Sequence, residues 1–258
     1  MKGHHKKFGI LIAVILCWSM MAATPALAAD VSLGLGVGLA PDYEGSEDYT
    51  GVLIPYASVK WSNHMAFDLL GSKAKFNFIP SPNWKGGLVG EFISERDDVD
   101  NNKVDRLEDV DTSIMLGGFF GWENQSWTAS IEAMADVADG NDGAIIRLNG
   151  GHRLKINDMW AMGFGAFVTW ADEDYTESYF GIDLADSVRS GLSTYDADAG
   201  FKDLGLNLMV TYQPWQNWGF MGLATYKRLV GDAADSPVVE DEGSENQLTT
   251  GVLVTYKF

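Results

Sequence analysis

The sequence predicts an all-β protein, a transmembrane antiparallel up-and-down β-barrel of about twelve strands, on three observations. Segments in which apolar and polar residues alternate recur along the chain from Val31 onward. The connections between these segments are short and long in turn. After residue 28, charged or turn-forming residues interrupt every apolar stretch. A membrane-embedded form therefore requires a closed barrel, because hydrocarbon offers no partner for unpaired backbone groups.

The first 28 residues have the order of a secretory signal peptide. Three lysines precede an apolar run over 8–21, and Ala26 and Ala28 fit the small-residue rule for cleavage. We therefore predict a cleaved signal peptide over 1–28 and one barrel domain over 29–258. A retained helix is the alternative, but the run has 14 residues, fewer than the roughly 20 that a span needs.

The composition of the predicted mature chain excludes several classes of protein. Cys17 is the only cysteine and lies in the signal, so a disulfide framework, a Cys-ligated zinc site and a cysteine nucleophile are excluded. It follows Leu16, whereas lipoprotein processing needs a small residue there, so we predict no lipid anchor. The formal charge of −18 becomes −21 when the signal lysines are removed, which disfavours nucleic-acid binding by a basic surface.

Twelve segments alternate well enough to be placed as strands. They are 31–39, 52–61, 64–70, 73–79, 84–94, 112–122, 126–136, 144–156, 159–170, 201–212, 218–229 and 248–258. Most have the length of about 9–11 residues that a tilted transmembrane strand needs. The third and fourth are short.

The connections between these strands alternate in length. The short ones are 62–63, 81–83, 123–125, 157–158 and 213–217. The others, most of them long, are 40–51, 71–72, 95–111, 137–143, 171–200 and 230–247. Short periplasmic turns that alternate with longer external loops are typical of outer-membrane barrels. The even strand count then places both termini in the periplasm.

Tryptophan and acidic residues follow the same alternation. Of the eight tryptophans after residue 28, only Trp170 lies by a long loop. The other seven, beside short turns, are Trp61, Trp84, Trp122, Trp127, Trp160, Trp215 and Trp218. They predict an aromatic girdle at the periplasmic interface. Of 36 acidic residues, 28 fall in five of the external connections, so we predict acidic external loops.

The segment 248–258 predicts the closing strand. Its residues alternate without a break, and the chain ends on Phe258 with Tyr256 two positions earlier. This ending resembles the closing strand and assembly signal of bacterial outer-membrane barrels. It implies the barrel-assembly machinery as a partner, in an environment of outer-membrane lipid and lipopolysaccharide.

Charged side chains on the strands are predicted to face the lumen. They are Lys73, Lys75, Lys85, Arg147, Arg153, Lys155, Glu91, Glu132, Asp136 and Asp203. A pore lining and a plug of internal ion pairs both stay open, because twelve strands lie between small filled barrels and wide porins. Gly34, Gly36 and Gly38 alternate along the first strand. We predict that they face the lumen and leave room for another segment.

Few residues are suited to catalysis. His64 and His152 are the only histidines after residue 28, both on predicted strands, and we interpret them as structural or interfacial. His152 falls in a lipid-facing row that holds no serine, and Pro55 removes a ladder donor from its strand. We predict no catalytic residue and no enzyme. An outer-membrane esterase is the alternative, and it requires one of these histidines as its base.

Two acidic clusters contain the hard oxygen ligands that Ca²⁺ and Mg²⁺ prefer. They are Asp97, Asp98, Asp100 and Asp105, and Asp172, Glu173 and Asp174. Neither has the glycine and terminal glutamate of an EF-hand loop, so we predict solvated acidic loops, no metal site and no cofactor. Weak divalent-ion bridging to lipopolysaccharide phosphates is a hypothesis that calcium titration of thermal stability would test.

Several loop motifs share a resemblance to one family. They are Pro41-Asp42-Tyr43-Glu44-Gly45-Ser46, Tyr179-Phe180-Gly181, Ser190-Gly191-Leu192, Tyr195-Asp196-Ala197, Ala199-Gly200 with Lys202-Asp203, and Gly231-Asp232-Ala233-Ala234-Asp235-Ser236-Pro237. Together with the Tyr256-Lys257-Phe258 ending, and in this order over the whole mature chain, they resemble the MltA-interacting protein (MipA)/OmpV family of outer-membrane proteins.

The resemblance implies an outer-membrane barrel whose best-known relative is a scaffold joining a lytic transglycosylase to a murein synthase. Other members are linked to adhesion and to osmotic or antibiotic responses. We therefore predict a non-enzymatic scaffold for peptidoglycan remodelling, with the periplasmic turns and their tryptophans as the contact surface. A small-solute channel is the alternative, followed by an adhesin or the esterase. The sequence assigns no binding residue.

Overall fold

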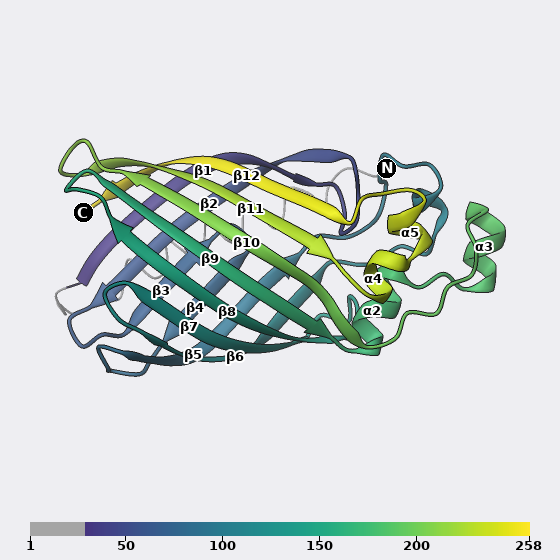
Figure 1. Ribbon diagram of the computed structural model, residues 1–258, viewed down its shortest axis with the longest axis horizontal. Coiled ribbons are helices and arrows are strands. Elements are labelled where there is room, and N and C mark those ends of the chain that lie inside the picture. Colours follow the sequence, from purple (N-terminus) through teal and green to yellow (C-terminus); the bar gives the residue numbers. More distant parts are fainter. Residues whose placement is uncertain (1–28) are drawn as a thin grey trace.

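The computed structural model describes residues 29–258. The predicted signal peptide, with Cys17, lies outside the described residues. Within them, twelve antiparallel strands form a closed barrel in which each strand pairs with its neighbours in sequence and β1 pairs with β12 (Figure 1). The predicted fold class is confirmed. No helix in residues 29–258 is long and apolar enough to cross a membrane.

The twelve strands agree with the predicted ranges to within three residues at each end. They are β1 Ala29–Pro41, β2 Tyr49–Trp61, β3 Ala66–Leu70, β4 Lys73–Asn77, β5 Trp84–Ile93, β6 Ser113–Glu123, β7 Trp127–Asp136, β8 Ala144–Lys155, β9 Trp160–Ala171, β10 Gly200–Tyr212, β11 Trp218–Leu229 and β12 Asn246–Lys257. One assignment was wrong. The sequence predicts His64 on the third strand, but it lies in the β2–β3 turn with φ of 69°.

The outward rows of the strands are apolar, and aromatic residues collect at the end with the short turns. Trp84, Trp127, Trp215 and Trp218 are all exposed there, whereas Trp170 lies at the opposite end of β9. The position of the predicted girdle is therefore confirmed. His152 pairs in register with Trp127, and their ring centroids lie 4.3 Å apart, so His152 is on the lipid-facing row as predicted.

The position of Pro55 explains why a proline is tolerated on β2. The last pair between β2 and β3 is Tyr56 with Leu70, and Pro55 lies just beyond it. Its carbonyl accepts a hydrogen bond from the N–H of Gly71 in the β3–β4 turn. On the side of β2 that faces β3, the position of the missing N–H of Pro55 lies opposite the turn and not opposite a residue of β3. The ladder between β2 and β3 therefore loses no hydrogen bond.

The inward positions 34, 36 and 38 of β1 are glycines, and other side chains cover them. A Cβ on Gly36 would lie 2.5 Å from Cγ of Leu253, and one on Gly38 would lie 2.8 Å from Cδ1 of Ile54. Leu253 and Ile54 pack with Met221 in a buried apolar cluster. These glycines therefore face the lumen as predicted, but side chains of the neighbouring strands β2 and β12, and not another segment, fill the room that they leave.

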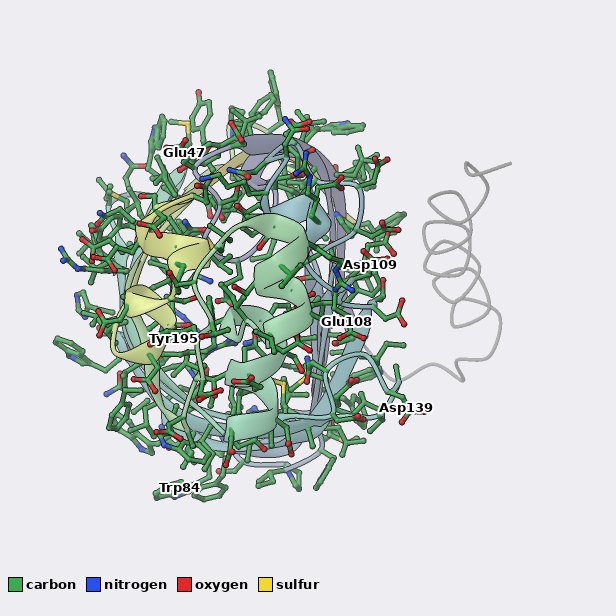
Figure 2. The ribbon with its side chains drawn as sticks, turned by 90° about the vertical axis from the view of Figure 1, so that its right-hand side faces the viewer. Glu47, Trp84, Glu108, Asp109, Asp139 and Tyr195 are labelled. Carbon is green, nitrogen blue, oxygen red and sulfur yellow. The ribbon has the colours of Figure 1, made fainter. Side chains whose placement is uncertain are left out.

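The long connections fold into short helices at one end of the barrel (Figure 1). They are η2 Val104–Arg106, α2 Glu173–Phe180, α3 Leu184–Ser190, α4 Asp232–Asp235 and α5 Pro237–Glu240. Figure 2 looks at this end and shows helices lying across the mouth of the barrel. We call residues 42–48, 94–112, 172–199 and 230–245 the cap. The sequence predicted solvated loops here and did not predict these helices.

Candidate functional site

The cap has an apolar core of its own. Its buried members come from four different connections and pack together: Tyr43, Val104, Leu107, Ile182, Leu192 and Val238. Burying large apolar side chains is the main source of stability for a folded segment. The external connections are therefore joined to one another as a single folded layer.

A second cluster joins the cap to the lumen wall. Tyr175, Tyr179 and Phe180 of α2 are buried against Met115 of β6 and Ile145 of β8. Tyr175 and Tyr179 have ring centroids 4.8 Å apart. Because these side chains are buried against strand residues, α2 fills the external mouth that it lies across.

The acidic residues of the cap have two different roles. Asp172, from one of the candidate metal clusters, accepts hydrogen bonds from the N–H of Tyr175 at 3.1 Å and of Ala144 at 2.9 Å, and so caps α2. Asp97, Asp98 and the other acids of the first cluster are exposed. Among residues 29–258, no three His, Cys, Asp or Glu side chains are grouped as metal ligands would be.

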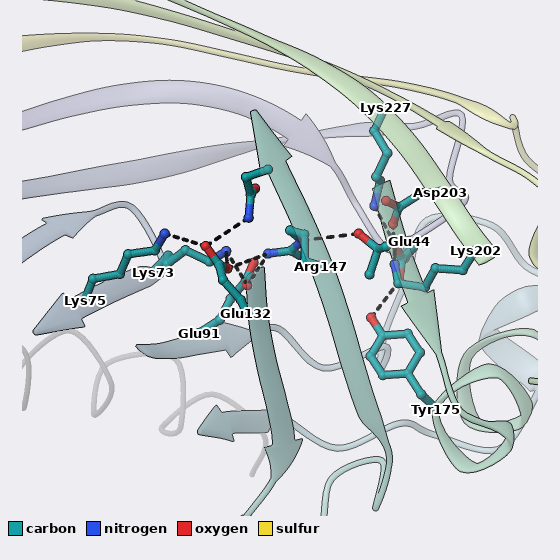
Figure 3. A network of polar contacts seen from close by, with 12 residues as sticks. Glu44, Lys73, Lys75, Glu91, Glu132, Arg147, Tyr175, Lys202, Asp203 and Lys227 are labelled. Carbon is teal, nitrogen blue, oxygen red and sulfur yellow. Dashed lines mark hydrogen bonds and ion pairs between the residues drawn. The ribbon is translucent and has the colours of Figure 1, made fainter. Parts of the chain in front are cut away.

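A buried ion network fixes the cap to the wall at β10 and β11, and we call it the upper network. The Nζ of Lys202 lies 2.6 Å from Oε1 of Glu44 and 2.6 Å from Oδ2 of Asp203 (Figure 3). Lys227 also pairs with Glu44, and the hydroxyl of Tyr175 donates to Glu44 Oε2 at 2.9 Å. Lys202 and Asp203 are only 3% and 1% exposed. Four parts of the chain therefore meet at one carboxylate.

The charge state of Glu44 follows from these contacts. Burial acts to raise the pKa of its carboxyl, but the two lysines and their hydrogen bonds outweigh burial and hold the pKa well below its usual range. Burial, with the Glu44 charge beside it, raises the pKa of Tyr175 well above its usual value. Glu44 is therefore a carboxylate and Tyr175 a neutral donor throughout the physiological range.

The residues after Glu44 hold its segment in place. Gly45 has φ of 102°, a conformation that favours glycine, and its N–H donates to Oε1 of Gln247 at 3.2 Å. A Cβ on Gly45 would lie 2.6 Å from Cγ2 of Val239. The motif 41–46 thus combines an ionic contact, a tight turn and close packing against α5.

A second network lies on one wall of the lumen below the cap, and we call it the lower network. Glu132 of β7 accepts from Lys73 at 2.8 Å, from Lys75 and from Asn149 at 3.1 Å (Figure 3). Arg147 of β8 lies 2.8 Å from Glu91 of β5, which also pairs with Lys73 at 3.2 Å. The structure therefore joins five of the residues predicted to face the lumen by ion pairs inside the barrel: Lys73, Lys75, Glu91, Glu132 and Arg147.

The other predicted lumen residues lie elsewhere. Asp203 belongs to the upper network, and Lys85 and Arg153 share Glu123 nearer the periplasmic mouth at 3.4 and 3.3 Å. Lys155 pairs with Asp158 in the β8–β9 turn. Asp136 was predicted to face the lumen, but its carboxylate accepts from the N–H groups of Ile114, Gly140 and Asn141 at the external rim.

The sequence reasoning missed Glu44, Tyr175, Lys202 and Lys227 as a group. A bulge between Phe201 and Asp203 shifts the register of β10, so that Lys202 and Asp203, adjacent in sequence, are both buried. Strict alternation would place one of them outward. The available signal was the position of Glu44 and Lys202 inside motifs that the family resemblance had singled out.

The two histidines lie on opposite walls. β2, which leads into the turn of His64, and β8, which carries His152, are six strands apart in either direction around the barrel. They therefore share no site.

The family model of the MltA-interacting protein MipA matches residues 33–258. The chain belongs to the MltA-interacting protein family. It is an outer-membrane barrel with the cap and networks described above. The match covers nearly all the residues that the structure describes, so the family shown and the family predicted from the loop motifs are the same.

Relatives match over most of their length at modest identity. The MltA-interacting protein of Escherichia coli (strain K12) is 25% identical over 248 residues, 95% of this chain and 98% of that protein. The outer membrane protein YiaT of Escherichia coli O157:H7 is 25% identical over 93% of this chain and 96% of its own. OmpV of Vibrio cholerae is 27% identical over 54% of this chain and 57% of its own.

A solved outer membrane channel from Pseudomonas putida F1 superposes with a TM-score of 0.43 and 9% identity, covering 91% of this chain and 97% of that one.

Proposed function

We propose that this protein is a non-enzymatic outer-membrane scaffold that holds peptidoglycan-remodelling enzymes, a lytic transglycosylase and a murein synthase, at the inner surface of the outer membrane. The observation that supports it most directly is the cap, whose buried side chains fill the external mouth, so that we expect partner proteins to bind at the periplasmic end. A relative whose alignment covers 95% of this chain, at 25% identity, is named the MltA-interacting protein. The same location implies contact with outer-membrane lipid, lipopolysaccharide and the barrel-assembly machinery.

The arrangement of titratable groups favours a scaffold over an esterase. A catalytic base needs a nucleophile within hydrogen-bond reach. His152 lies against the ring of Trp127 on the lipid-facing row, and its Nδ1 is buried without a hydrogen-bond partner. His64 lies in an exposed turn on the opposite wall.

A small-solute channel is the second candidate, and the partly exposed lysines of the lower network are the observation that favours it. The cap opposes it, because buried aromatic side chains of α2 occupy the external mouth. Bilayer conductance of the folded protein tests this candidate directly.

A pull-down from detergent-solubilised envelopes tests the scaffold. The folded protein is the bait, and an unrelated barrel with a plugged lumen is the control. We expect specific recovery of a lytic transglycosylase or a murein synthase. Recovery of neither enzyme, from a bait that is shown to be folded, would reject the scaffold and leave the channel as the better proposal.

A further inference from the structure

The lumen below the lower network is accessible to solvent. Asn207 of β10 faces inward, where its Oδ1 accepts from the hydroxyl of Thr225 at 2.8 Å, and it is exposed. Lys73 and Lys75 also face inward and are 24% and 31% exposed. Water that contacts these inward side chains must lie inside the barrel. Because the cap fills the external mouth, we infer that this water enters through the periplasmic mouth.

Small residues line this space between the lower network and the periplasmic mouth. Inward-facing positions are occupied by Gly121, Ser130, Gly151, Gly163, Gly165 and Thr211. A Cβ on Gly163 would have its nearest neighbour, Met209, 3.8 Å away. At Gly163 the lumen wall therefore leaves room for a further group.

The charge of this space is opposite to that of the molecule. Its cations are Lys60, Lys73, Lys75, Lys85, Arg147 and Arg153, and its acids are Asp68, Glu91, Glu123 and Glu132. Six cations face four acids here, whereas residues 29–258 together carry −21. An anionic occupant is favoured inside and repelled by the cap at the other end.

Two facing walls of the lumen differ in chemistry. The wall of β4, β5, β7 and β8 carries the lower network, with the Nζ of Lys75 5.3 Å from the ring centroid of Phe119. The opposite wall carries partly exposed apolar side chains, among them Tyr56, Met209 and Leu223, which pack on the buried cluster described above for β1. Successive side chains of an extended peptide point to opposite sides. A segment that alternates acidic and apolar residues would satisfy both walls at once.

We propose that the periplasmic half of the lumen is a docking site for an extended, acidic segment of a periplasmic partner protein. The inference deepens the scaffold function and rests on it. Stable interfaces bury on the order of 1,200–2,000 Å² in total. Turns such as those at Gln125 and Asp158 offer little surface, whereas a segment inserted into the lumen is enclosed on all sides.

The test uses the absence of cysteine from residues 29–258. Asn207→Cys, carrying a bulky maleimide adduct attached after folding, blocks the lumen. Gln125→Cys with the same adduct is the matched control in the exposed β6–β7 turn. The probe is a fluorescein-labelled decapeptide of alternating glutamate and valine, compared with a lysine–valine decapeptide. Fluorescence anisotropy with the detergent-solubilised barrel measures binding.

We expect the glutamate peptide to bind at least about ten-fold more tightly than the lysine peptide, since 1.4 kcal/mol corresponds to that ratio. Its binding should be lost with the adduct at position 207 and kept with the adduct at position 125. Equal binding of the two peptides, or binding that survives the lumen adduct, overturns the docking site.

The same two adducts separate this inference from the scaffold. Enzyme recovery in the pull-down should be lost with the lumen adduct only. If both modified proteins recover the enzymes, the scaffold stands and the docking site is wrong. If no form recovers them while the peptide still binds, the scaffold is wrong and the lumen site stands as a peptide site.

Discussion

The Nζ of Lys202 lies 2.6 Å from Oε1 of Glu44, although 158 positions separate the two residues in the chain. The pair is buried and joins the first external connection to the start of β10. Lys227 and Tyr175 bring β11 and α2 to the same carboxylate. Beside the apolar clusters, the charge of one side chain therefore helps to hold the cap on the wall.

Glu44→Gln should release the cap without unfolding the barrel. Breaking a buried ion pair by removing one partner costs about 3–5 kcal/mol, because the remaining charge stays buried. We expect the connection 172–199 to become sensitive to limited proteolysis and the melting temperature to fall. Lys103→Gln is the control, since Lys103 pairs with Glu242 while 52% exposed and such pairs contribute about 0–1 kcal/mol. Equal protease resistance of Glu44→Gln and the native protein would contradict the role of the network.

The same carboxylate predicts a pH dependence. The pKa of Glu44 is lower in the folded protein than in the unfolded chain. Its contribution to stability is therefore fully present above the unfolded value of about 4.3 and is lost as pH falls through the folded pKa. Melting temperatures measured from pH 6 downward should decline more steeply below about pH 4.3 in the native protein than in Glu44→Gln. Parallel curves for the two proteins would exclude Glu44 as the titrating group.

Gly45→Ala should destabilise the same region through the backbone. The new Cβ meets Cγ2 of Val239 at 2.6 Å and the residue keeps φ of 102°, so we expect a loss of about 1–3 kcal/mol. Gly51→Ala is the matched control, because no atom lies within 4 Å of its Cβ. Thermal unfolding of both variants checks the difference, and equal melting temperatures would show that the turn tolerates a side chain.

The strands could be predicted from the sequence because each has a lipid face and a lumen face, which imposes a period of two on residues such as those of β7 and β12. The cap could not. Its core joins Tyr43, Leu107 and Val238 from three connections, and no local pattern shows that they meet. The lumen charges were recognised but not their pairing, since the bulge beside Lys202 depends on the contacts of the folded chain. The sequence predicts His64 on the third strand because the alternating pattern of β3 continues into the preceding turn.

Because α2 closes the external mouth of the barrel, a mutation in the buried cluster between α2 and the lumen wall should change the conductance. Phe180 is fully buried between the cap and the lumen wall, and its removal should cost about 3–5 kcal/mol of local packing. We expect the native protein to remain close to baseline in planar bilayers and Phe180→Ala to show larger and fluctuating conductance. Leu184→Ala is the control, because Leu184 on α3 is 74% exposed and contributes nothing to closure. Native conductance equal to that of Phe180→Ala would mean that the cap does not seal the mouth, and the channel would then explain the lumen charges better than the scaffold.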